Sequence, residues 1–177
     1  MKISIFTEDT GTTREKSEVT FKDFYQGGFL AIASLADQLN EYGDVELNIL
    51  SEQFGPVQGE EKVDEYLNRD QTELEYEEDG LSTLLESTTT SDVMVLLLSA
   101  SKFDSLVKTN WERIVDKAKP DSIWCLGAAR SSLASVDFAP LQRKGREVIT
   151  YKRVGVARIS NETRDELLEQ IEQRQLE

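Results

Sequence analysis

Two kinds of apolar pattern alternate along the chain. Continuous apolar runs predict five buried strands, at about residues 2–7, 45–51, 92–98, 121–126 and 147–153. The run at 92–98 is the most apolar and is predicted as the central strand, because a strand covered on both faces need not alternate. Residues 154–159 are predicted to extend the last strand along the edge of the sheet.

Between these runs, apolar residues recur at helical spacing. They predict helices around 32–39, 81–85, 103–118 and 163–171, of which 103–118 is the longest and is expected to be continuous. Alternating strands and helices predict a single α/β domain spanning residues 1–177. The expected fold is a three-layer sandwich with a mostly parallel sheet of about five strands, Rossmann-like or flavodoxin-like. The pattern does not predict the order of the strands.

An aromatic turn and a Gly-Gly pair precede the first of these helices. Phe21, Phe24 and Tyr25 are spaced to form one aromatic face of a short helical turn. Gly27 and Gly28 follow, and both are expected to be backbone requirements, through a positive φ or a close approach of other atoms.

An acidic insert at about 58–80 interrupts the alternation. Between Glu60 and Asp79 there are ten acidic residues and two basic ones, Lys62 and Arg69. Carboxylates at this density are able to bind Mg²⁺. Their spacing matches no metal-binding loop, however, so the sequence favours a solvated face and predicts no metal site.

The charge balance limits the partners and the location. The chain has 34 acidic and 20 basic residues, a net charge of −14, which repels nucleic acid at long range. Ordinary acidic solubility and adaptation to a high-salt, halophilic cytoplasm both explain this surplus. No apolar run approaches the ~20 residues that span a bilayer, and the N-terminus does not resemble a signal peptide. A cytoplasmic protein without a membrane partner is therefore expected.

Missing residue types exclude several classes of enzyme. The chain has no histidine, so a Ser-His-Asp triad, a Cys-His pair and a His-containing zinc site are impossible. Its one cysteine, Cys125, excludes an internal disulfide and lies within a predicted strand, where an inert buried thiol is expected. The sequence identifies no cofactor and leaves the oligomeric state open.

The candidate site is at the carboxyl ends of the predicted strands, where open α/β sheets bind their ligands. Ser51, Glu52, Lys102, Arg130 and Arg153 lie at or just past these ends and are expected to converge. Because no imidazole exists, any catalysis is assigned to carboxylates such as Glu52 and to Lys102. Arg130 stands near a predicted helix start, where amide groups favour an anion.

Three further residues complete the predicted binding site. Ser131 adjoins Arg130, and the rings of Tyr25 and Phe54 are candidates for stacking on a base. From 143 to 158 there are six basic residues and one acidic residue. This basic segment is either an edge paired with the acidic insert or a local site for an anion such as a phosphate.

Three short motifs carry a resemblance to a known family. The segments FYQGG at 24–28, ILSEQFG at 49–55 and VDEY at 63–66 resemble those of the YaaA-type peroxide-stress proteins and their small relatives, over about residues 21–66. The first strand differs, ending in Thr7-Glu8-Asp9 where that group is expected to carry Cys or Lys. The resemblance implies association with DNA.

Two functions follow as expectations. The first is a nucleotide- or nucleobase-binding protein that acts on or associates with nucleic acid, through an anion site at the carboxyl ends of the strands. The alternative is a non-catalytic interaction module of the same fold, whose acidic face meets a basic partner. Fold alone does not decide between them.

Overall fold

A computed structural model describes residues 1–15, 18–69, 71–153 and 158–177 of the chain. Its core is one six-stranded sheet in the order β3-β2-β1-β4-β5-β6. The strands are β1 (Lys2–Glu8), β2 (Asp44–Ser51), β3 (Gly55–Gln58), β4 (Val93–Leu97), β5 (Ile123–Ala128) and β6 (Glu147–Lys152). All neighbouring strands are parallel except β3, which runs antiparallel to β2 at the edge. Without β3 this is the doubly wound order 2-1-3-4-5 of flavodoxin-like folds.

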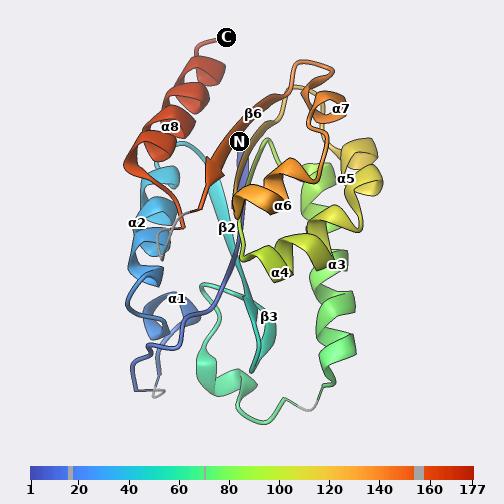
Figure 1. Ribbon diagram of the computed structural model, residues 1–177. Helices are drawn as coiled ribbons and strands as arrows, with labels where there is room; N and C mark the ends of the chain where they lie inside the picture. The colour runs from blue at the N-terminus through green and yellow to red at the C-terminus, as the bar shows by residue number, and fades with distance from the viewer. Residues whose placement is uncertain (16–17, 70, 154–157) are drawn as a thin grey trace.

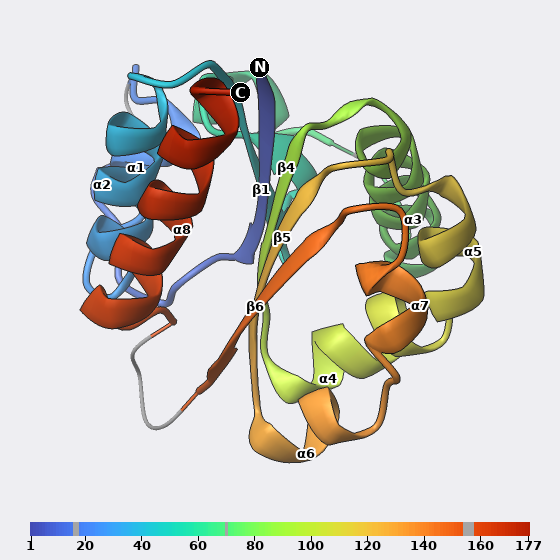
Figure 2. The same ribbon diagram turned by 90° about the horizontal axis from the view of Figure 1, so that it is seen from above.

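Helices cover both faces of the sheet and complete the predicted three-layer α/β sandwich (Figures 1 and 2). One face carries α1 (Phe21–Phe24), α2 (Phe29–Leu39) and α8 (Asn161–Gln175). The other carries α3 (Glu73–Thr90), α4 (Ala100–Lys102), α5 (Trp111–Lys117), α6 (Arg130–Ala134) and α7 (Ala139–Gln142). No helix among the described residues combines the length and the apolar character that crossing a membrane requires.

Burial on both faces explains the continuous apolar runs. Every residue of β4 and of β5 is buried, and their side chains divide between two separate cores. Val93, Val95 and Cys125 face α2 and α8, whereas Met94 and Leu96 face α3 and α5. The Cys125 thiol is fully buried, and this burial raises its pKa to about 12, in accord with an inert thiol.

The sheet contains a strand that the sequence did not predict. β3 pairs with β2 through Pro56 opposite Leu50 and Gly55 opposite Ser51. Its four residues are too few to show alternation, and glycine and proline at its start indicate a loop. Proline is compatible with an edge strand, since the lost amide donor faces no neighbour there. At the opposite edge, residues 154–157 of the predicted extension lie outside the described residues.

The predicted continuous helix at 103–118 is wrong. A π-helical segment, η2 (Phe103–Lys108), follows α4, and α5 begins only at Trp111. The amide of Thr109 donates to the carbonyl of Asp104, five residues earlier, at 3.2 Å. Asn110 then leaves the helical conformation, and its side chain donates to the carbonyl of Leu106 at 2.9 Å. π turns inside helices are frequent at functional sites.

The acidic insert forms regular elements, and its described carboxylates are exposed, apart from the half-buried Glu61. It forms the end of β3, the short 3₁₀ helix η1 (Val63–Tyr66) and the first half of α3. The predicted short helix at 81–85 is therefore the second half of a helix of 18 residues. A capping box at Thr72 and Glu75 begins it, and its acidic first turn complements the positive end of the helix dipole.

The two glycines before α2 have different conformations. Gly27 has a φ of +63°, as the sequence predicts for a required glycine. Gly28 has a φ of −60° and a ψ of −20°, which any residue adopts, so it does not have the predicted positive φ.

Candidate functional site

The carboxyl ends of β1, β2 and β4 surround a cleft of about 1090 Å³ on the α3 side of the sheet. The chain order reverses between β1 and β4, because β1 leads to β2 on one side and β4 leads to β5 on the other. Such switch points are where doubly wound sheets bind their ligands. The first half of α3 forms one wall of the cleft, α4 and η2 form the opposite wall, and the turn from β2 into β3 forms its end.

Glu8, the last residue of β1, lines the cleft and is held there by Ser99, which lies just after β4. The amide of Ser99 donates to Glu8 Oε2 at 2.6 Å, and the Ser99 hydroxyl donates to Glu8 Oε1 at 2.9 Å. Ser99 is also the N-cap of α4, since its hydroxyl accepts from the amide of Lys102 at 3.3 Å. The carboxylate is therefore fixed at the switch point, with an acceptor site used on each oxygen.

Arg158 fixes the backbone on the other side of Glu8. Its buried guanidinium donates to the Thr7 hydroxyl at 2.7 Å, to the carbonyl of Glu8, and to the carbonyl of Asp9 at 3.0 Å. Burial lowers the pKa of Arg158 from its ordinary value, partly offset by Glu8 and Asp9. A side chain from the segment just before α8 thus holds the turn that follows the first strand.

Asp9, Ser51 and Tyr25 form a polar network beside the cleft. Tyr25 donates from its hydroxyl to Ser51 Oγ at 3.2 Å, and Ser51 donates to Asp9 Oδ2 at 3.1 Å. The amide of Glu52 also donates to Asp9 Oδ2, at 3.3 Å. Burial raises the pKa of Asp9, against the lowering effect of these two hydrogen bonds, and burial raises the pKa of Tyr25 to about 12. The network orders the ends of β1 and β2 against each other.

Five residues predicted at the carboxyl ends separate into two groups. Ser51, Glu52 and Lys102 all line the cleft, with Glu52 exposed and Lys102 half-buried. Arg130 and Arg153 lie outside its lining, at the ends of β5 and β6. The structure therefore brings three of the five together.

The second group, Arg130 and Arg153, lies with Ser131 at the ends of β5 and β6, and we call these three residues the cationic corner. The amide of Arg153 donates to the carbonyl of Ala128 at 2.8 Å, which keeps Arg153 beside the end of β5. Arg130 begins α6 two residues after Ala128, and Ser131 follows it; both are exposed. Figure 2 shows α6 beside α4, so this corner adjoins the α4 wall of the cleft.

Tyr25 and Phe54, predicted to stack on a base, lie in the core on the other face of the sheet. Each is 2% exposed. Their rings pack against Phe24 at centroid distances of 5.0 and 6.3 Å, and Phe54 also meets Phe21 edge to face. Their faces are thus turned to other rings, because the aromatic face of the turn at 21–25 covers the sheet.

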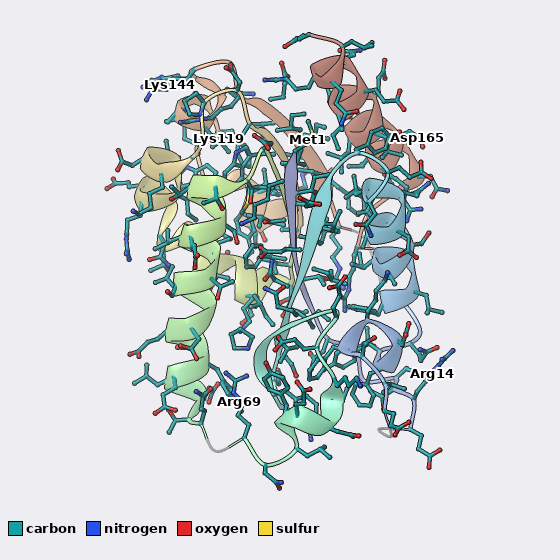
Figure 3. The ribbon with its side chains drawn as sticks, turned by 180° about the vertical axis from the view of Figure 1, so that it is seen from behind. Met1, Arg14, Arg69, Lys119, Lys144 and Asp165 are labelled. Carbon is teal, nitrogen blue, oxygen red and sulfur yellow. The ribbon has the colours of Figure 1, made fainter. Side chains whose placement is uncertain are left out.

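The ring of Tyr76, on α3, lines the cleft, although it is not among the predicted site residues. It lies against Gly55, whose φ is +75° and where a Cβ would overlap the ring. The guanidinium of Arg69 lies 5.4 Å from the Tyr76 ring centre and 5.1 Å from that of Tyr66. Arg69 also donates to the carbonyl of Phe54 at 2.8 Å, and Figure 3 shows it between the start of α3 and η1.

The lining of the cleft is acidic. It includes two basic side chains, Arg69 and Lys102, and five carboxylates: Glu8, Glu52, Glu73, Glu77 and Glu78. Hydroxyl and amide side chains from the α4–η2 wall and from the end of the cleft add donors and acceptors, among them Ser101, Ser105, Thr109, Asn110 and Gln53. Of the residues not predicted, Ser99 had a readable signal, a serine directly after a buried strand and before a helix.

Comparisons with known proteins identify neither a family nor a function for this chain. No protein-family model matches the chain, and no curated protein matches its sequence. It is similar to the solved structure of a flavodoxin from Streptococcus pneumoniae TIGR4, with 14% identity, a TM-score of 0.43, and coverage of 97% of this chain and 96% of that chain. A likeness at this level carries no argument about this chain. The resemblance to YaaA-type proteins stays a prediction.

Proposed function

We propose that this protein binds a nucleobase or nucleoside in the cleft at the β1/β4 switch point. The observation that carries the proposal is the lining of that cleft, which combines fixed hydrogen-bonding groups with an aromatic ring and apolar surface. Glu8 and Ser99 supply oriented polar groups at one end, and Tyr76 supplies a ring at the other. A planar heterocycle with polar edges has the complementary chemistry.

The charge of the lining favours a base or nucleoside over a nucleotide. Five carboxylates face two cations, and the guanidinium of Arg69 is already bonded to the carbonyl of Phe54. A phosphate dianion brought into this lining meets net repulsion that Lys102 alone does not offset. If the ligand reacts there, Glu52 and Lys102 are the acid–base groups that the cleft offers.

A phosphate belongs instead at the cationic corner formed by Arg130, Ser131 and Arg153. A nucleic-acid strand that placed one base in the cleft would run past α4 toward this corner. Arg130 in particular is exposed and is able to fork onto a phosphate. The corner supports the association with nucleic acid that the family resemblance implies.

Titration of the protein with nucleobases, nucleosides and their 5′-monophosphates, followed by calorimetry, tests the proposal. We expect nucleosides to bind and the matched monophosphates to bind more weakly. Ser105→Trp, at an exposed position that lines the cleft, should abolish binding. Ser131→Trp, exposed but outside the lining, is the matched control and should leave nucleoside binding unchanged. Loss of binding in the Ser131 variant alone would move the site to the cationic corner.

The acidic interaction module is the second candidate, and α3 is the observation in its favour. This helix carries six acidic residues and no basic one, and all six are exposed. Such a surface attracts a basic partner by charge, with an affinity that falls as salt rises. Mass spectrometry of small molecules released from the denatured purified protein separates the two candidates, because only the first predicts a retained base or nucleoside.

A further inference from the structure

We infer that the cleft takes a ribonucleoside in preference to a 2′-deoxynucleoside or a free base, and that the wall formed by α4 and η2 binds the ribose hydroxyls. The inference rests on the proposed function, because it names the class of nucleoside that the same cleft would take. It begins from the hydrogen bonds that the polar side chains of this wall already form.

Three polar side chains that line the cleft from this wall donate their protons to their own segment. The Ser105 hydroxyl donates to the carbonyl three residues earlier, at 3.3 Å. The Thr109 hydroxyl donates to the carbonyl of Asp104 at 2.9 Å. The side-chain amide of Asn110 donates to the carbonyl of Leu106, also at 2.9 Å. The backbone of the wall therefore holds all three side chains in place.

These bonds decide what the wall offers to a ligand. A hydroxyl whose proton is already used keeps its oxygen lone pairs as acceptors. An amide whose NH₂ group is turned to a backbone carbonyl points its oxygen away from that carbonyl. Ser105 and Thr109 thus offer Oγ acceptors, and Asn110 offers Oδ1, which has no partner among the residues that the structure describes.

The π turn gathers these acceptors into one cluster. Ser105 and Thr109 are four residues apart, a spacing that places side chains on the same face of a helical segment. The carbonyl of Asp104 accepts both the amide and the hydroxyl of Thr109, which fixes that side chain at the wide turn. Asn110 follows directly, where the chain leaves the helical conformation. The cluster is held before any ligand arrives, so binding need not order it.

A cluster of neutral acceptors is complementary to a group that carries several donors. The 2′- and 3′-hydroxyls of ribose are adjacent donors, and each is able to turn its proton toward the wall. A 2′-deoxyribose keeps only one of these two donors, and a free base has neither. A phosphate dianion has no proton to donate and would meet lone pairs at this cluster.

The size of the cleft also favours a nucleoside over a free base. Pockets of about 300–1,000 Å³ hold drug-sized ligands, and this cleft measures about 1090 Å³. It therefore has room for a sugar against the α4–η2 wall and for a base elsewhere. Leu50, Pro56 and Leu81 provide apolar lining for the faces of that base.

The four common ribonucleosides, their 2′-deoxy counterparts and the free bases are matched probes for calorimetry. For each base that binds, we expect the ribonucleoside to bind about fivefold more tightly than the 2′-deoxynucleoside, because the lost hydrogen bond leaves an acceptor of the wall unpaired. The free base should bind most weakly.

Two variants test the assignment to the wall. Thr109→Val keeps the shape of the side chain and removes its acceptor, and combined with Ser105→Ala it should lower the ribose-to-deoxyribose ratio to about two or less. The matched control is Thr89→Val. Thr89 is exposed, lies outside the lining of the cleft, and makes the same kind of bond, from its hydroxyl to the carbonyl of Leu85 at 3.1 Å. This control should preserve the ratio.

The outcomes separate the inference from the proposed function. Equal binding of ribonucleosides and 2′-deoxynucleosides to the wild-type protein overturns the inference and leaves nucleoside binding intact; this comparison needs no variant to fold. A full preference in the combined variant, with unchanged unfolding behaviour, overturns the assignment to this wall. If no base or nucleoside binds but putrescine does, the acceptors serve an ammonium ligand, and both proposals fail. Binding of none of these probes overturns both as well.

Discussion

The backbone at Gly27 differs from that at Gly28, although the two glycines are adjacent. Gly27 occupies the left-handed region, with a φ of +63°, where a Cβ is unfavourable. Gly28 is the N-cap of α2 and has helical angles. Gly27 is therefore favoured by its conformation, whereas the conformation of Gly28 is open to any residue.

Alanine at these two positions tests this difference. Gly27→Ala should lower the free energy of unfolding by about 1–2 kcal/mol, because the left-handed conformation costs that much for a residue with a Cβ. Gly28→Ala should be close to neutral and is the matched control. Urea denaturation of both variants provides the measurement. Equal losses of stability in the two would contradict the assignment.

Single residues also show how far the site was predictable. The rule that ligands bind at the carboxyl ends of strands correctly brought Ser51, Glu52 and Lys102 into one cleft. The same rule did not show that Arg130 lies outside this cleft, because the position of Arg130 depends on the order of the strands, which the sequence does not predict. Tyr25 lies in the core, where its ring packs against other side chains. The helical spacing of aromatic residues did not reveal this, because the same spacing is expected for rings that stack on a ligand and for rings that pack in a core.

At the scale of elements, strands were predictable where burial was complete. β4 and β5 are buried on both faces, so each is a continuous apolar run. β3 and η2 were not predictable, because an edge strand of four residues and a single π turn depend on contacts distant in sequence. Both elements shape the cleft, so the parts of the fold that the sequence concealed are parts of the site.

The first half of α3 is the element on which the cleft depends most. It carries Glu73, Tyr76 and Glu77 on one wall, and its start is held by the capping box of Thr72 and Glu75. The Thr72 hydroxyl accepts from the amide of Glu75 at 3.2 Å, and the Glu75 carboxylate accepts from the amide of Thr72 at 3.1 Å. The acidic insert thus builds one side of the candidate site.

Removing the cap should weaken both stability and binding. Thr72→Ala should cost about 1 kcal/mol of unfolding free energy, the usual effect of losing an N-cap. It should also weaken nucleoside binding, because the wall of the cleft begins there. Ser82→Ala, at an exposed position in the middle of α3, is the control. It should lower neither the free energy of unfolding nor the affinity for nucleosides. Unchanged binding with lowered stability would show that this wall is not part of the site.

At the scale of the whole molecule, the dominant feature is the charge of −14. The surplus is spread over both helical layers, because α3 carries six acidic residues and no basic one, and α8 carries five acidic and two basic residues. Ion pairs such as Lys119–Asp92 at 2.6 Å are partly exposed and so contribute little. The folded state therefore concentrates negative charge that the unfolded chain spreads out.

Stability should rise with salt, and the shape of the rise distinguishes the two explanations of the acidity. Screening is nearly complete at about 1 M, where the Debye length is ~3 Å. If the surplus serves ordinary solubility, the melting temperature should climb with KCl and level off by about 1 M. If it is an adaptation to high salt, the climb should continue to higher concentrations. Replacing exposed Glu77, Glu86 and Glu169 with glutamine should reduce the rise in either case, because less repulsion remains to be screened. A melting temperature that stays flat or falls with KCl would remove self-repulsion as a determinant of the stability of this fold.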